Sequence, residues 1–209
     1  MKELIVVGAG GFGRELLHWI KAINREHKKW IIKGFIDDNL GALDGYECDY
    51  QVIGRIDSWQ PGPAEVFACA IAHPQTKEQV VTELKARGAF FENIIHPQAS
   101  TGEFNKIGEG LVMYPKANLT VNVTIGNFVT LLSSAGHDVT IGDYSTISSF
   151  CGLNGKVQIG KRVFLGSHVA IVPGRKIGDD AFIAAGSVVV SNVKPNKKVM
   201  GNPAKTMQF

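Results

Sequence analysis

Aliphatic residues recur at a strict interval of six positions along the carboxyl-terminal half of the chain. The run consists of Ile141, Ile147, Leu153, Ile159, Leu165, Ile171, Ile177, Ile183 and Val189. An α-helix repeats about every 3.6 residues and a strand about every two, so neither produces this spacing. A solenoid with three short faces per coil does produce it, because each face directs one aliphatic side chain inward. The pattern therefore predicts an all-β solenoid of parallel coils.

Two further features refine this prediction. Earlier anchors at the same interval are Ile107, Met113, Leu119, Ile125 and Leu131. Ile125 and Ile141 are 16 residues apart where three hexads need 18, so one coil is shortened by two residues. Counting back six from Ile141 makes Ala135 an anchor, and His137 then falls at a position that faces outward.

Residues 1–97 follow a different pattern, in which strand-like and helix-like segments alternate. We expect strands at 4–7, 33–38 and 66–71, helices at 14–25 and 76–87, and a glycine loop at 8–13. This order is typical of a small parallel β-α-β unit, a Rossmann-like half domain. Pro97 marks the junction, so the predicted domains are an α/β domain at 1–97 and the solenoid with its tail at 98–209.

Composition excludes several classes of protein. The chain has 209 residues, 44% of them hydrophobic, which is enough to bury a core. Its formal net charge of +3 is too small and dispersed to indicate nucleic-acid binding. Three cysteines without C-x-x-C spacing suit a reducing compartment, and the apolar amino terminus turns directly into glycines without the core of a signal peptide. We expect a cytoplasmic protein with no membrane insertion.

The segment Gly8-Ala9-Gly10-Gly11-Phe12-Gly13 contains G-x-G-x-x-G between a predicted strand and a predicted helix, and Asp37 ends the next strand. Such a loop receives a diphosphate on the amides of a helix start, while the acid binds a ribose. The unit lacks a second mononucleotide half, which favours a sugar nucleotide over NAD. Alternatively, the glycines only permit tight packing of strand and helix. Arg14 would either pair with phosphate or cover a solvated helix face.

The segment Gly136-His137-Asp138 is the sharper chemical signal. An outward histidine acts as a general base when an acceptor fixes its tautomer and supports the imidazolium. Neighbouring side chains on a strand point apart, so Asp138 would instead help a bend, and a plain surface histidine is the other alternative. His168 fits a surface position, and His73 fits either a ligand contact or a turn. No cluster has the spacing of a metal site.

With the hexads, the glycine loop, Asp37-Asp38, the Gly-His-Asp segment and the terminal Gly201-Asn202-Pro203-Ala204-Lys205 in place, the chain resembles the sialic acid O-acetyltransferase and sugar-nucleotide N-acetyltransferase family. The resemblance covers essentially the whole chain. It implies a left-handed parallel β-helix, a homotrimer, and acetyl-CoA as cosubstrate without a metal.

The resemblance also implies roles for individual residues. It makes His137 the catalytic base and Asp138 the acid that supports it. It places the nucleotide-linked amino sugar on the α/β domain, at Gly10, Gly11, Phe12, Gly13, Arg14, Asp37, Asp38 and His73. It places acetyl-CoA in a groove between two solenoids, near Thr146, Gly155, Ser167, Ala185, Gly186 and Pro203. Some relatives have a second histidine where this chain has Thr146.

We therefore expect an acetyl-CoA-dependent N-acetyltransferase that acts on the amine of a nucleotide-linked sugar, in the synthesis of surface polysaccharide or glycan precursors. His137 would take the proton of the amine, and a backbone N–H at a coil turn would stabilise the oxyanion. Three alternatives remain: an O-acetyltransferase of a sialic-acid-like sugar, a non-catalytic sugar-nucleotide binding protein, and an NAD-dependent oxidoreductase.

Overall fold

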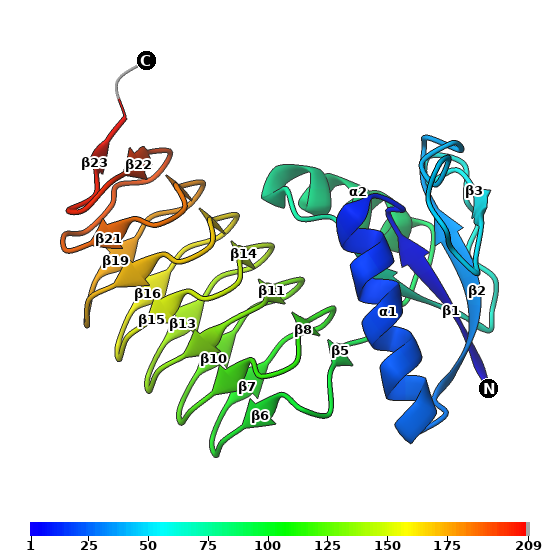
Figure 1. Ribbon diagram of the computed structural model, residues 1–209, viewed down its shortest axis with the longest axis horizontal. Coiled ribbons are helices and arrows are strands. Elements are labelled where there is room, and N and C mark those ends of the chain that lie inside the picture. The colour runs from blue at the N-terminus through cyan, green and yellow to red at the C-terminus, as the bar shows by residue number, and fades with distance from the viewer. Residues whose placement is uncertain (208–209) are drawn as a thin grey trace.

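The computed structural model describes residues 1–207 and consists of a small α/β domain beside a three-sided parallel β-solenoid. In Figure 1 the α/β domain stands next to the first coils, coloured green, while the orange and red coils extend away from it. The predicted carboxyl-terminal tail is described as far as residue 207, and its last two residues lie outside the described part.

The α/β domain follows the predicted order with longer elements. It contains β1 (Lys2–Val7), α1 (Gly11–Glu26), β2 (Trp30–Ile36), β3 (Val52–Gly54), β4 (Glu65–Cys69) and α2 (Pro74–Ala86). All strands are parallel, in the order β3-β2-β1-β4. The prediction missed the short strand β3, and α1 begins at Gly11 rather than Arg14, because backbone hydrogen bonds form as soon as Gly10 caps the helix.

The solenoid has three sheets. The eight-stranded sheet contains β5 (Ile94–Ile95), β8 (Val112–Met113), β11 (Thr130–Leu131), β14 (Thr146–Ile147), β17 (Phe164–Leu165), β20 (Phe182–Ile183), β22 (Lys198–Met200) and the antiparallel β23 (Lys205–Thr206). The six-stranded sheet contains β6 (Ser100–Thr101), β9 (Asn118–Leu119), β12 (Ser134–Ala135), β15 (Gly152–Leu153), β18 (Ala170–Ile171) and β21 (Val188–Val189). The five-stranded sheet contains β7 (Lys106–Ile107), β10 (Thr124–Ile125), β13 (Thr140–Ile141), β16 (Gln158–Ile159) and β19 (Lys176–Ile177).

The hexad anchors form the solenoid core, as predicted. From Met113 to Val189 each anchor is buried. Ala135, the anchor that follows the shortened connection between β11 and β12, is fully buried. Ile107 is the exception, with 37% of its surface exposed, because β7 is the edge strand of its sheet and no coil lies beyond it. The solenoid also begins at Ile94, ahead of the predicted boundary at residue 98, so Pro97 lies inside the first coil.

The α/β domain packs on the outer face of the eight-stranded sheet. Val112 and Tyr114 of the first coils share a buried cluster with Leu16 of α1. On the other side of the domain, Phe91 stands edge-on to Phe128, with ring centroids 5.1 Å apart. The domain is therefore fixed to one of the three solenoid faces.

Candidate functional site

His137 lies at the solenoid corner between β12 and β13, and its side chain is 58% exposed. Asp138 adopts a left-handed backbone conformation, with φ of 60°. This turn overrides the strand rule that neighbours point apart, so the Asp138 carboxylate lies 2.8 Å from His137 Nδ1. The carboxylate therefore both forms the bend and contacts the imidazole, which the sequence left as alternatives.

The charge on Asp138 fixes the histidine tautomer. The hydrogen bond with His137 holds the pKa of the Asp138 carboxyl below its usual value, so the group is ionised at neutral pH. An ionised carboxylate only accepts hydrogen bonds, so Nδ1 is the protonated nitrogen in this contact, and in the neutral imidazole the lone pair is on Nε2. Nε2 is the nitrogen available to a substrate.

Gly155 lies beneath the imidazole, one coil further along. A Cβ atom built on Gly155 would come within 2.3 Å of His137 Nε2 and 2.4 Å of Cε1. A side chain at this position would push the ring aside. Among residues 1–207, the Gly155 N–H donates to no backbone or side-chain acceptor, whereas its carbonyl accepts from the Gly174 N–H.

The glycine loop forms an open helix start. A Cβ on Gly13 would lie 2.0 Å from the Gly8 carbonyl oxygen, so this glycine is needed for tight packing. Gly10 and Gly11 have no such neighbour and leave the amino terminus of α1 open to an anion. Both interpretations of the glycines thus apply, at different positions of the same loop.

The residues predicted around this loop have internal partners. The Ala9 N–H donates to Asp37 across 2.8 Å, so Asp37 shapes the loop itself. Asp38 accepts from the Asp57 N–H across 3.0 Å. Arg14 lies over the Tyr46 ring at 3.6 Å from its centroid.

His73 caps α2 and borders a pocket between the two domains. Its Nδ1 accepts a hydrogen bond from the Thr76 N–H across 3.4 Å, which settles its turn role. The pocket has a volume of about 480 Å³ and is lined from the α/β domain by residues 72–75. The solenoid contributes Arg162, Phe164, Asp180, Ala181, Phe182 and Lys198.

Stacked aromatic rings and an arginine–aspartate pair form the solenoid wall of this pocket. Phe164 and Phe182 stack on successive coils, with centroids 5.3 Å apart and planes within 5° of each other. Arg162 donates two hydrogen bonds of 2.8 Å to Asp180, and its pairing with that carboxylate lowers the pKa of Asp180. Arg162 could not be predicted as part of a site, because a single arginine in a coil has no distinguishing sequence pattern without its partners.

The residues expected to bind acetyl-CoA occupy different parts of the solenoid. Ser167, Ala185 and Gly186 lie at corners between the eight- and six-stranded sheets, whereas Gly155 lies at the next corner around the coil. Pro203 is exposed in the tail, after a cis peptide bond with Asn202. No single edge of one chain carries all of them.

Thr146 is not on an accessible surface, contrary to expectation. It is 2% exposed, donates to the Ala72 carbonyl across 2.7 Å and accepts from Lys77 across 2.8 Å. The α/β domain covers it, and this contact cannot be predicted from the sequence because its partners lie about seventy residues earlier. Thr146 therefore belongs to the domain junction.

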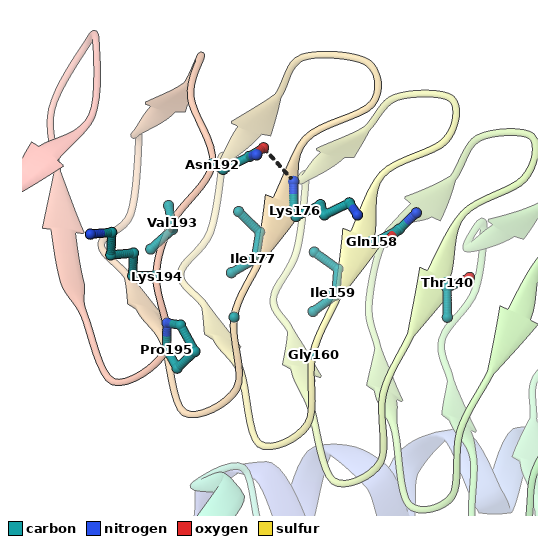
Figure 2. A pocket seen from close by; sticks show the side chains of 11 residues that line it. Thr140, Gln158, Ile159, Gly160, Lys176, Ile177, Asn192, Val193, Lys194 and Pro195 are labelled. Atoms are coloured by element: carbon teal, nitrogen blue, oxygen red, sulfur yellow. Dashed lines mark hydrogen bonds between the residues drawn. The ribbon is translucent and has the colours of Figure 1, made fainter.

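A second recess, of about 490 Å³, lies on the five-stranded sheet. Figure 2 shows Thr140, Gln158 and Lys176 on successive strands, with the segment 192–195 on the next coil beside Lys176. The Lys176 N–H donates to the Asn192 side chain across 2.9 Å and closes one side of the recess. None of the predicted site residues lines it.

Two negative observations apply to residues 1–207. No group of three or more histidine, cysteine, aspartate or glutamate residues is arranged to hold a metal ion. No helix in this part of the chain is both long enough and apolar enough to cross a membrane.

The three-sided parallel solenoid built of six-residue repeats is typical of the left-handed β-helix acyltransferases. Residues 3–84 match the PglD N-terminal domain, and residues 156–191 match the bacterial transferase hexapeptide of six repeats. The chain is 30% identical over 215 aligned positions to a GDP-perosamine N-acetyltransferase from Escherichia coli O157:H7, covering 97% of this chain and 95% of that one. It therefore belongs to the hexapeptide-repeat acetyltransferases that carry a PglD-type N-terminal domain.

Two solved structures are similar over their full length. The acetyltransferase domain of PglB from Neisseria gonorrhoeae FA1090, in complex with acetyl coenzyme A, is 25% identical, with a TM-score of 0.85 and 99% of both chains covered. WeeI from Acinetobacter baumannii AYE is 28% identical, with a TM-score of 0.87, covering 99% of this chain and 100% of that one. The predicted fold class, family and enzyme class are confirmed.

Proposed function

We propose that the protein transfers an acetyl group from acetyl-CoA to the amine of a nucleotide-linked amino sugar, with His137 as general base. The observation that carries this proposal is the exposed His137–Asp138 pair over Gly155, on a chain that also has an open helix start for a diphosphate. Two relatives support it: one is a GDP-perosamine N-acetyltransferase, and the acetyltransferase domain of PglB forms a complex with acetyl coenzyme A.

The reaction follows from the geometry of the pair. The sugar amine attacks the thioester carbonyl, a C–N bond forms, and Nε2 of His137 accepts the proton that the amine loses. Asp138 stabilises the resulting imidazolium through Nδ1. The free N–H of Gly155 stabilises the tetrahedral oxyanion, after which the C–S bond breaks and the CoA thiolate receives the proton from the imidazolium.

The site is completed by a second copy of the chain. His137 lies at the edge between the six- and five-stranded sheets, whereas the α/β domain covers the eight-stranded sheet, which is the face opposite that edge. The base of one chain therefore cannot reach the glycine loop of the same chain. We propose a homotrimer in which His137 of one copy approaches the interdomain pocket of the next, with acetyl-CoA between them.

Two solenoids also unite the scattered acetyl-CoA residues. Gly155 would come from the copy that supplies the base, and Ser167, Ala185 and Gly186 from its neighbour. Gly10 to Gly13 and Arg14 would contact the diphosphate, and Asp38 and His73 would border the rest of the substrate. Asp37 would act on the nucleotide through the loop that it holds.

A direct assay tests the proposal. Acetyl-CoA and a panel of UDP-, GDP-, dTDP- and CMP-linked sugars, with and without an amine, would be incubated with the protein while thiol release is measured. We expect turnover with an amino sugar and a loss of about 10²-fold or more in kcat for His137→Ala, from the usual size of general-base catalysis. His27→Ala, an exposed histidine at the end of α1, is the matched control. Turnover with hydroxyl sugars alone would indicate an O-acetyltransferase, and normal kcat in His137→Ala would remove the base from the mechanism.

A further inference from the structure

Lys77 is an unusual residue of this structure. It is 1% exposed, and among residues 1–207 it is the only buried lysine. Burial lowers the pKa of its ammonium to about 8. A buried cation is unfavourable unless hydrogen bonds or an opposite charge compensate for its lost hydration, so the groups around the ammonium have to be identified.

Four neutral oxygen atoms surround the Lys77 Nζ atom, and all of them belong to the solenoid. Nζ donates to the Phe128 carbonyl across 3.2 Å, to Thr130 Oγ1 across 3.0 Å and to Thr146 Oγ1 across 2.8 Å. The Ser145 carbonyl lies 3.4 Å away. The ammonium thus joins α2 to β11 and β14 without a carboxylate partner in the described residues.

One of these contacts continues to the wall of the interdomain pocket. The Thr146 hydroxyl accepts a hydrogen bond from Lys77 and donates one to the Ala72 carbonyl across 2.7 Å. The Lys77 N–H also donates to the His73 carbonyl across 2.9 Å. Ala72 and His73 line the pocket, so Lys77 holds this loop from its backbone and from its side chain.

We propose that Lys77 is a positioning residue that sets the shape of the interdomain pocket through Thr146 and Ala72. The relay fixes the loop between β4 and α2 against the solenoid, so the nucleotide-linked sugar is presented at one distance from the approaching base. The identity of the ligand in this pocket rests on the proposed function. The hydrogen-bond relay from Lys77 to the loop does not depend on it.

Three variants separate this relay from a general structural role. Lys77→Met removes the ammonium, and Thr146→Val breaks the link to Ala72 with little change of shape. Thr130→Val is the matched control, because Thr130 is equally buried and also accepts from Lys77, but it makes no contact with the loop. Kinetics with the amino-sugar substrate and hydrogen exchange of residues 70–77 would be measured on each full-length protein.

We expect the KM for the acceptor to rise about 10-fold or more in Lys77→Met and Thr146→Val, with kcat changed less and with faster exchange in the 70–77 segment. Thr130→Val should change both measurements by less than about 3-fold. The double variant of Lys77 and Thr146 should be no worse than the more severe single one, since both act in one relay. Equal effects in Thr130→Val and Thr146→Val, or unchanged exchange in folded Thr146→Val, would overturn the proposal. The exchange measurement decides this even if the wild type transfers no acetyl group.

Discussion

Substituting Gly155 by alanine offers a test of the site that leaves the fold almost untouched. The new Cβ would stand 2.3 Å from His137 Nε2, where ordinary contact needs 3.4 Å or more. The imidazole must therefore move by about 1 Å. Gly155 has no left-handed φ, so alanine fits the backbone, and the displaced group is an exposed ring that can shift into solvent. We expect the free energy of unfolding to change by less than about 1 kcal/mol.

The effect on catalysis should be far larger than the effect on stability. A displacement of about 1 Å at a reacting group can lower the rate by about 10²-fold, because proton transfer needs hydrogen-bond distance. We therefore expect kcat of Gly155→Ala to fall by about 10²-fold while the KM for the nucleotide sugar stays within about 3-fold. The Gly155 N–H survives in this variant, so the loss would belong to the base.

Steady-state kinetics and chemical denaturation on the same preparations would measure both quantities. Gly152→Ala is the matched control, because Gly152 lies in the same coil and nothing lies within 4 Å of its Cβ position. A Gly155→Ala protein with kcat within about 2-fold of wild type would refute the reasoning. Either the ring would not rest on Gly155, or the ring would not be the base.

Three further outcomes are expected. Asp138→Asn should lower kcat by more than about 10-fold in the same assay, with acceptor KM little changed, because the neutral amide no longer fixes the tautomer or supports the imidazolium; an unchanged kcat would contradict this. Gly11→Asp, at the open helix start, should raise the acceptor KM by about 10-fold or more through repulsion of the diphosphate. At low acceptor concentration, mixed oligomers of Gly11→Asp with His137→Ala should be more active than either variant alone. Activity no higher than the average of the two variants would place the site within one chain. Folding lowers the pKa of Lys77 from 10.5 to about 8, so between these pH values the unfolded chain binds this proton more tightly than the folded chain does. The unfolding free energy of the wild type relative to Lys77→Met should therefore rise by about 3 kcal/mol from pH 8 to pH 10.5. A difference that stays constant with pH in urea denaturation would contradict the burial of a charge.

The solenoid could be predicted because its core repeats in the sequence. Each anchor from Met113 to Val189 is buried because every face of a coil directs one side chain inward, and the six-residue spacing shows which one. The shortened coil could also be predicted, since a deletion of two residues shifts the anchors visibly. Ile107 is exposed because burial at an edge depends on whether another coil follows, which the repeat does not state.

The domain junction could not be predicted for a different reason. In the sequence, Lys77 stands between Thr76 and Glu78 on a polar helix and resembles any solvated lysine. Its partners are 51 to 69 residues away and are neutral, so neither charge pairing nor hydrophobic periodicity indicates its burial. The same applies to Thr146, which we expected near acetyl-CoA and which the α/β domain covers instead.

The 18-residue coil decides which side chains meet at a corner, and this explains how the fold builds a base. Phe164 and Phe182 are 18 residues apart and stack face to face, and so are Phe150 and His168, with planes within 20° of each other. His137 has glycine at the corresponding position, 155, so the Nε2–Cε1 edge of its ring lies against backbone where a side chain would collide with it. His168 is also followed by glycine one coil later, at Gly186, but it stacks on Phe150 of the preceding coil. Glycine one coil later is therefore not sufficient to mark a functional corner. What distinguishes His137 is the combination of glycine on the next coil with a carboxylate on Nδ1 instead of a stacked ring.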